Sequence, residues 1–189
     1  MQLNKIESNY LKKEAFRNDT ITFSNLENIE FEACIFENIT FSNLNMQNIT
    51  FKTCEFKNCI WDNVEVFKCN FFNSKLVNVS FNETKLSKTT FDDSLLLIID
   101  VIDCNMKECS FKISKIDDLR IKGSNLSYID FYNSKVDSLE LYDNKCQEVY
   151  LYSSRVGLIK GDIKTMRGFY MSMEQILDLV TKIGINLHE

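Results

Sequence analysis

The chain has 189 residues, 22 basic and 27 acidic side chains and a hydrophobic fraction of 44%, which fits one folded domain and excludes a disordered chain. Its longest apolar run, Leu95 to Ile99, is far shorter than the roughly 20 residues that cross a bilayer, so no membrane span is expected. The residues from Met1 to Glu7 lack the apolar stretch of a signal peptide, and we therefore expect a cytoplasmic protein. A formal net charge of -5 disfavours direct binding of nucleic acid, which requires a basic surface.

The dominant pattern is an apolar residue at every fifth position from Leu11 to Val156. Five residues turn a side chain by roughly 500° around a helix, which would spread the apolar set over all of its faces. An odd period does not fit a flat strand either, because strand faces alternate every two residues. The chain must therefore bend once per pentad. A second inward position, two residues before each of these, carries small or aliphatic side chains, with Asn144 as the main exception.

A longer period of twenty is superimposed on the pentads, as in Cys34, Cys54, Ser74 and Ser94. Four pentads therefore make one coil, and residues twenty apart should stack at the strand spacing of about 4.8 Å. The pattern predicts an all-β solenoid with one ladder of phenylalanines and one of corner asparagines. The first comprises Phe31, Phe51, Phe71, Phe91, Phe111 and Phe131, and the second Asn18, Asn38, Asn58 and Asn78.

The repeat resembles that of the pentapeptide-repeat proteins over residues 11–161. Their consensus of a small or aliphatic residue, Asp or Asn, then Leu or Phe is matched by Ser24-Asn25-Leu26, Leu44-Asn45-Met46 and Ser124-Asn125-Leu126. The resemblance implies a right-handed quadrilateral β-helix and says little about function. Residues 1–20 are expected to form an N-terminal cap and an irregular first coil, because Glu14 and Asp19 occupy inward-type positions. The β-helix is then expected over 21–161, followed by a C-terminal helical segment over 162–189.

After Gly161 the five-residue pattern ends and a helical one begins. Ser172-Met173-Glu174-Gln175 is a capping box, and apolar residues follow at helical spacing up to Gly184, which predicts one amphipathic helix of about three turns. The helix either only covers the last coil or also pairs with a second copy, and the surplus of apolar residues favours a homodimer. The dimer residues would be Phe169, Tyr170, Met171, Met173, Ile176, Leu177, Val180 and Ile183.

The same tail, over 171–177 and 183–187, resembles the end of the Qnr-type and MfpA-type quinolone-resistance proteins, in which it builds a twofold dimer. Those proteins imitate duplex DNA and occupy the DNA-binding saddle of bacterial type II topoisomerases. The unbroken register from Leu11 to Val156 leaves no room for the projecting loops of Qnr-type relatives, so the loop-free MfpA-type is the closer comparison.

Outward charges are unevenly distributed over the predicted sides. On the side whose inward residues include Phe41, Trp61 and Phe81, the outward acids outnumber Arg120 and Lys122. A solvated face is one interpretation. Under the resemblance, this acidic stripe would meet DNA gyrase or topoisomerase IV and would modulate the enzyme or protect it from quinolones or toxins. Duplex DNA carries about one charge per 1.7 Å, so any mimicry is partial. The stripe comprises Asp62, Glu83, Asp100, Asp103, Glu140 and Asp143, with Asp162 at its end.

A second group of outward residues is apolar and lies near the middle of the predicted column. Either a local bulge buries some of them, or they form a docking patch for a partner protein, in which case the chain is an interaction scaffold. The outward Tyr132, Tyr142, Tyr150 and Tyr152 would extend such a patch toward the C-terminal helix. The apolar patch comprises Phe67, Phe72, Val77, Leu95, Leu97, Ile98 and Ile102.

Nothing in the sequence predicts catalysis. The single histidine, His188, has no partners from which a triad could be built, and the glycines fit no phosphate-binding loop. Cys54 with Cys59 and Cys104 with Cys109 stand five residues apart, which places them among the inward side chains as core filling. We therefore expect a protein that is not an enzyme, with no catalytic residue, cofactor or metal site.

Overall fold

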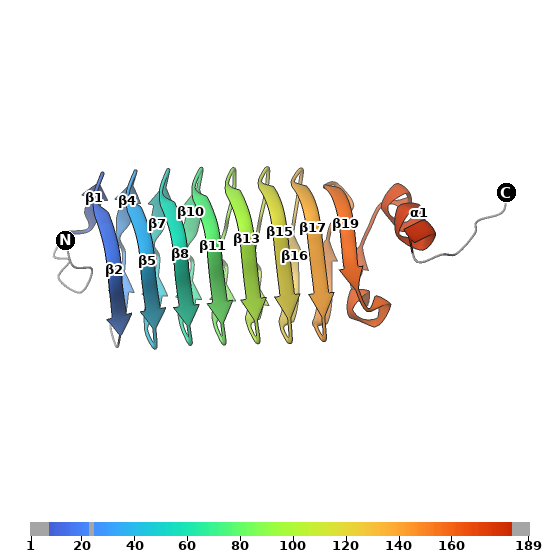
Figure 1. Ribbon diagram of the computed structural model, residues 1–189, viewed down its shortest axis with the longest axis horizontal. Coiled ribbons are helices and arrows are strands. Elements are labelled where there is room, and N and C mark those ends of the chain that lie inside the picture. Colours follow the sequence, from blue (N-terminus) through green and yellow to red (C-terminus); the bar gives the residue numbers. More distant parts are fainter. Residues whose placement is uncertain (1–7, 23–24, 183–189) are drawn as a thin grey trace.

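The computed structural model describes residues 8–22 and 25–182. The chain winds into a parallel β-solenoid whose strands stack in chain order along one axis, with the first coil at one end and the C-terminal helix at the other (Figure 1). The strand pairings join residues twenty apart, for example Phe51 with Phe71 and Leu76 with Leu96. The predicted coil of four pentads is therefore confirmed.

The strands form three parallel sheets, of which the second and third run the length of the solenoid and the first ends at β10, beyond which isolated bridges continue that side. The first contains β1 (Tyr10–Lys12), β4 (Glu30–Glu32), β7 (Thr50–Lys52) and β10 (Asn70–Phe72). The second contains β2 (Ala15–Thr22), β5 (Ile35–Ser42), β8 (Glu55–Asp62), β11 (Lys75–Asn82), β13 (Leu95–Ile102), β15 (Lys115–Lys122), β17 (Lys135–Tyr142) and β19 (Arg155–Gly161). The third contains β3 (Asn25–Glu27), β6 (Asn45–Gln47), β9 (Glu65–Phe67), β12 (Lys85–Ser87), β14 (Asn105–Lys107), β16 (Asn125–Asp130), β18 (Lys145–Tyr150) and β20 (Phe169–Tyr170).

The solenoid has four sides, named by the inward residues of one coil: Phe51 on the first side, Phe56 on the second, Trp61 on the third and Val66 on the fourth. The first and third sheets form the first and fourth sides, and the longer strands of the second sheet form the second and third. In β2, β5, β8, β11 and β13 the bend lies at one residue in left-handed backbone geometry, which asparagine tolerates well. The corner residues Asn18, Asn38, Asn58 and Asn78 have φ of 52°, 55°, 54° and 54°.

Their side chains form the predicted asparagine ladder. The amide of Asn38 donates to Oδ1 of Asn18 at 2.7 Å, that of Asn58 to Asn38 at 3.0 Å and that of Asn78 to Asn58 at 2.9 Å. Each exposed corner is thereby tied to the corner of the coil before it.

Aromatic rings fill much of the core. In the phenylalanine ladder of the first side, the centroids of Phe71, Phe91 and Phe111 are separated by 4.7 and 4.9 Å, and the rings are parallel to within 9°. Trp61 is stacked less evenly between Phe41 and Phe81 on the third side, at 4.7 and 4.9 Å with interplanar angles of 25° and 27°. The ladder predicted from the twenty-residue period is therefore confirmed.

Polar groups at the second inward position are satisfied by the backbone. The hydroxyl of Ser94 donates to the carbonyl of Phe71 at 2.8 Å and accepts from the N–H of Ser74 at 3.0 Å. Asn144, the exception in the pattern, fits for the same reason: its amide donates to the carbonyl of Ile121 at 2.8 Å, and its Oδ1 accepts from the N–H of Ser124 at 2.9 Å. Buried polar groups therefore hold consecutive coils together.

The N-terminal end is more regular than the sequence predicted, whereas the C-terminal end is as predicted. Strands β1 and β2 pair in normal register with β4 and β5, so the irregular first coil is not seen in residues 10–12 and 15–22; Glu14 and Asp19 remain half-buried at the end of the stack. At the other end, the 3-10 helix η2 (Ile163–Met166) is followed by α1 (Met173–Lys182), which confirms the predicted helix. Within the described residues, the helices are too short and too polar to pass through a bilayer.

Candidate interaction surfaces

The structure divides the acidic stripe of the third side into two parts. Asp100 on β13 and Glu140 on β17 lie in register on either side of Arg120 on β15. The Arg120 guanidinium donates to Asp100 Oδ1 at 3.0 Å and to Glu140 Oε2 at 3.3 Å, and Lys160 Nζ lies 2.8 Å from Glu140 Oε1. The hydrogen bond from Lys160, assisted by Arg120, lowers the pKa of Glu140. These two carboxylates are therefore largely neutralised within the chain.

The other four predicted acids line one edge of the third side, which we call the acidic corner: Asp62, Glu83, Asp103 and Asp143. The last three occupy equivalent corner positions with φ of 49°, 53° and 55°, and Asp62 is the final residue of β8 beside that corner. Within the part of the chain that the structure describes, none of the four belongs to an ion pair. Glu83 and Asp103 are one coil apart, or about 4.8 Å along the axis. The acidic corner is thus a row of carboxylates open to a cationic partner.

Gly123 interrupts this row for a steric reason. It has a φ of +63°, and a Cβ built on it would lie 2.1 Å from Oδ1 of Asp103. A side chain at this position would therefore have to displace the Asp103 carboxylate and would hold a strained backbone. Asp162, at the end of the predicted stripe, has a different role: its carboxylate accepts from the N–H of Lys164 at 3.0 Å and caps η2.

The predicted apolar patch is only partly brought together. Val77 on β11 stands next to Leu97 on β13, and Leu95, Ile98 and Ile102 follow along the same β13 strand. We call these five residues the apolar band. The β11–β13 register is the same before and after the corner at Ile98, so no bulge turns these side chains inward. Ile98 is 49% exposed, and the other four are half-buried.

Phe67 and Phe72 do not belong to this surface. Phe67 lies on β9 of the third sheet, where Lys68 Nζ is 5.1 Å from its ring centroid, and Phe72 lies on β10 of the first sheet. The grouping of all seven residues was therefore wrong, because the two phenylalanines project from other sides of the coil. The tyrosines are scattered in the same way: Tyr142 is on the third side, whereas Tyr150 stacks on Tyr170 at 4.9 Å, at the C-terminal end of the third sheet.

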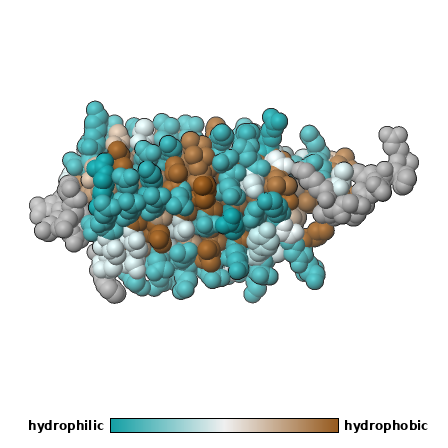
Figure 2. Space-filling model, viewed as in Figure 1, coloured by the Kyte–Doolittle hydropathy of each residue, from teal (hydrophilic) through white to brown (hydrophobic). Residues whose placement is uncertain are grey.

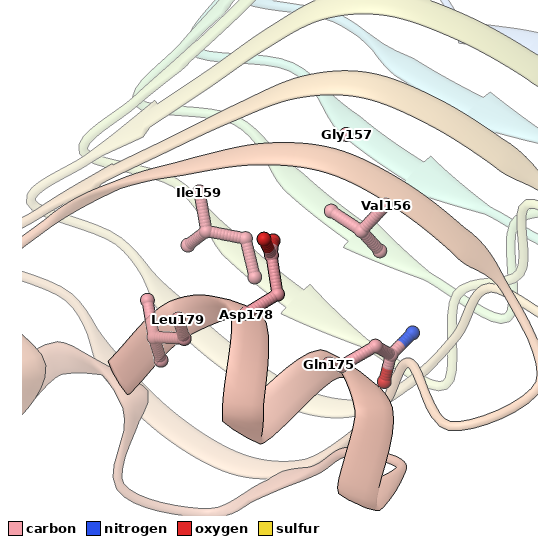
Figure 3. Close-up of a pocket in the computed structure, with 6 residues that line it drawn as sticks. All are labelled: Val156, Gly157, Ile159, Gln175, Asp178 and Leu179. Atoms are coloured by element: carbon pink, nitrogen blue, oxygen red, sulfur yellow. The ribbon is translucent and has the colours of Figure 1, made fainter. Parts of the chain in front are cut away.

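The capping box places α1 against the last coil. The Ser172 N–H donates to Oε1 of Gln175 at 2.8 Å and the Gln175 N–H to Ser172 Oγ at 3.2 Å. The side-chain amide of Gln175 also donates to the carbonyls of Leu151 and Ser154, each at 2.8 Å, so the same residue ties the helix to the solenoid. Figure 3 shows Val156 and Ile159 of β19 facing Asp178 and Leu179 of α1 across a narrow gap. The helix therefore covers part of the open end of the core.

The apolar residues of this region fall into two groups. Phe169 and Met171 pack against the core, together with Met166, which was not predicted. Met173, Ile176 and Leu177 of α1 are 70%, 41% and 43% exposed, as is Tyr170 at 50%, and Val180 is half-buried. Ile183 lies outside the described residues. Within residues 8–22 and 25–182, an apolar face of α1 is thus exposed.

The cysteines are core residues. Cys34, Cys54, Cys59, Cys69, Cys104 and Cys109 are buried and unpaired, and burial raises the pKa of Cys54 and Cys109 to about 12. Their thiols donate to backbone carbonyls, as that of Cys104 does to Phe81 at 3.2 Å. Such thiols are poor nucleophiles and poor metal ligands. The described residues contain no group of three or more His, Cys, Asp or Glu arranged to hold a metal ion, and His188 lies outside them.

The sides, the twenty-residue coil and the two inward positions per pentad define the architecture. The chain has the pentapeptide-repeat fold. No protein-family model matches the sequence, and no curated protein is detectably similar to it. Among solved structures, full-length QnrB1, a plasmid-mediated fluoroquinolone resistance protein, is 15% identical, with 93% of this chain and 100% of that chain covered and a TM-score of 0.39. HetL, a pentapeptide repeat protein involved in heterocyst differentiation regulation in the cyanobacterium Nostoc sp. strain PCC 7120, is 12% identical, with 87% and 90% covered and a TM-score of 0.27.

Proposed function

We propose that this pentapeptide-repeat protein is a non-catalytic inhibitor or protector of a bacterial type II topoisomerase, DNA gyrase or topoisomerase IV. The observation that carries the proposal is the acidic corner, where Glu83, Asp103 and Asp143 stand at spacings set by the coil and form no ion pair with any residue that the structure describes. A row of fixed carboxylates on a rigid column is a partial imitation of a DNA strand, in which phosphates follow one another at about 3.4 Å along the axis. The basic surface that normally receives DNA would receive this corner. The resemblance of the tail to quinolone-resistance proteins supports the same target.

Gyrase supercoiling in the presence of the protein tests the proposal. The wild-type protein is expected to reduce supercoiling, or to restore it in the presence of a quinolone, and the effect should weaken steeply with salt because exposed charges are screened. Neutralising the corner with Glu83→Gln, Asp103→Asn and Asp143→Asn together should abolish the effect. No effect of the wild-type protein at micromolar concentration would refute the proposal.

A matched control changes net charge equally without touching the third side. Glu27→Gln, Glu30→Gln and Asp93→Asn remove three carboxylates that make no ion pair among the described residues and lie on or beside the first and fourth sides. This variant should act like the wild type. If it loses activity as fully as the corner variant, total charge and not the corner is responsible.

We also propose that α1 joins two copies through Met173, Ile176 and Leu177, because three exposed apolar side chains on one short helix form a self-complementary surface. Two copies would double the length of acidic corner available to a twofold-symmetric enzyme. Met173→Lys with Ile176→Lys should yield a monomer in sedimentation velocity, whereas Ile163→Lys, at an exposed residue of η2, should leave the dimer intact. A wild-type protein that sediments as a monomer would contradict this part of the proposal.

A further inference from the structure

The two ends of a parallel β-solenoid are the places where another strand could be added. Within residues 8–22 and 25–182, β2 is the outermost strand of the second sheet at the N-terminal end, and β19 is the outermost strand at the C-terminal end. The edge of a sheet is a template for pairing with another chain, and proteins block such edges with a covering helix or with inward-pointing charges. The two ends of this solenoid use different devices.

At the C-terminal end, a side chain takes the place of a further coil. In the last full coil, the N–H of Arg155 donates to the carbonyl of Ser134 at 2.9 Å, and its equivalents make the same bond in the preceding coils. The next acceptor in this series is the carbonyl of Ser154, and the residue twenty positions after Arg155 is Gln175. The side-chain amide of Gln175 donates to that carbonyl at 2.8 Å. Helix α1 therefore supplies a bond that another coil would make, and it covers the edge of β19.

The N-terminal end instead carries two carboxylates at inward-type positions. Glu14 stands where Cys34 stands in the second coil, and Asp19 pairs in register with Ile39. Cys34 and Ile39 are 0% exposed, whereas the two acids are half-buried. Neither acid belongs to an ion pair with a residue that the structure describes, and Asp19 accepts only a hydrogen bond from the N–H of Thr20, at 2.9 Å, among these residues. A chain stacked on β2 would bury both carboxylates, which is costly without a partner charge.

The remainder of the first coil resembles any other coil. Its inward residues Leu11, Phe16 and Ile21 are apolar and at most 5% exposed. On the face shown in Figure 2, hydrophobic residues gather over the middle of the molecule, and the described part of the first coils is mostly hydrophilic. A partner of the first coil would therefore be attracted by the edge and the end of the core, and not by the outer surface of the sides.

We infer that the first coil is a self-association surface kept closed by Glu14 and Asp19, and that the molecule these acids exclude is a second copy of this chain. Because α1 covers the edge of β19, the first coil of one copy can meet only the first coil of another, about a twofold axis. In that contact each carboxylate would be buried close to those of the other copy, and like charges placed together repel. This surface lies at the opposite end from α1, so the inference does not depend on the proposed dimer or on a topoisomerase.

Sedimentation velocity tests the inference in a background that carries Met173→Lys and Ile176→Lys, which removes the contact proposed for α1. Glu14→Ser with Asp19→Ile introduces the residue types that later coils have at these positions. At about 50 µM the background protein should be a monomer, and the Ser/Ile variant should form dimers with a Kd at least about tenfold lower than that of any residual self-association in the background. Circular dichroism should show that the Ser/Ile variant melts at no lower temperature than the background.

Two control variants separate burial of charge from other effects. Glu27→Ser with Glu30→Ile makes the same replacements at exposed outward positions and should remain a monomer. Glu14→Ser with Asp19→Lys should also remain a monomer, because a buried ammonium is as costly as a buried carboxylate. If the Ser/Ile variant does not fold, Glu14→Ala with Asp19→Val tests the same point with smaller side chains. The inference is overturned if a folded variant without the two acids stays monomeric, or if either control dimerises as strongly.

Discussion

Removing one ring from the phenylalanine ladder is the most direct test of how the solenoid is stabilised. Phe111 is 3% exposed and stacks on Phe91 and Phe131 at 4.9 Å on both sides, with interplanar angles of 7° and 8°. Replacement of a buried phenylalanine by alanine costs about 3–5 kcal/mol through lost transfer energy and the cavity that remains. The two parallel stacks, worth about 0.5–1.5 kcal/mol each, place Phe111→Ala at the upper end of that range.

Urea unfolding followed by two probes provides the assay. The single tryptophan, Trp61, reports on the N-terminal half of the column, and circular dichroism reports on all of the strands. Because continuous sheets and ladders join each coil to the next, we expect the solenoid to unfold as one unit. Both probes should therefore report the same decrease in the free energy of unfolding for Phe111→Ala. Phe72→Ala is the control: that ring is 41% exposed, and its loss should cost less than about 0.5 kcal/mol.

Two results would refute this reasoning. A loss below about 1 kcal/mol for Phe111→Ala would mean that the ladder contributes little beyond filling space. A transition that shifts by circular dichroism and not by Trp61 fluorescence would mean that the C-terminal coils unfold independently, as in repeat arrays whose interfaces are weak.

The remaining predictions concern corners, charges and thiols. Gly123→Ala should lower the melting temperature by the equivalent of about 1–2 kcal/mol, because its φ of +63° is strained for alanine and the new methyl would meet Asp103; an unchanged melting temperature would contradict this. Ile98→Asn should gain about 1 kcal/mol in urea unfolding, because relief of a strain of about 1–2 kcal/mol exceeds the loss of a half-exposed side chain; a loss of stability would show that the corner is relaxed. Folding lowers the pKa of Glu140, so its ion pairs stabilise the folded state above the unfolded pKa, and this stabilisation is lost as the pH falls through the folded pKa. In Glu140→Gln the melting temperature should therefore fall less steeply as the pH is lowered. With Ellman's reagent at neutral pH, the seven thiols should react slowly until the chain unfolds. Cys146 should react first because it is only half-buried, although burial raises its pKa to about 11. An immediate reaction of several thiols would contradict their burial.

The fold could be predicted from the sequence because the repeat determines which way each side chain points as well as the order of the strands. Once every fifth residue is assigned to the core, residues twenty apart must share a side, and the stacking of Phe91 on Phe111 follows without further information. The capping box of Ser172 and Gln175 was equally readable, since it depends on local spacing.

The surfaces were less predictable, since outward side chains have freedom that inward ones lack. The spacing of twenty does contain the ion ladder of Asp100, Arg120, Glu140 and Lys160, and Lys160 could have been found by extending the same count. Whether a corner adopts left-handed geometry does not follow from the spacing: Ile98 keeps that geometry against its own preference, in continuity with the asparagines before it. That anomaly becomes visible only when the backbone angles are known.

The twenty-residue coil has a consequence for how such a chain can change in length. Duplication of one whole coil would lengthen every edge of the column and leave each row of outward residues aligned with itself. Duplication of a single pentad would turn everything downstream by a quarter of the circumference, moving Asp143 out of line with Glu83 and Asp103 while leaving the apolar interior almost undisturbed. Stability and recognition would thus tolerate different units of insertion, and only multiples of twenty would preserve both.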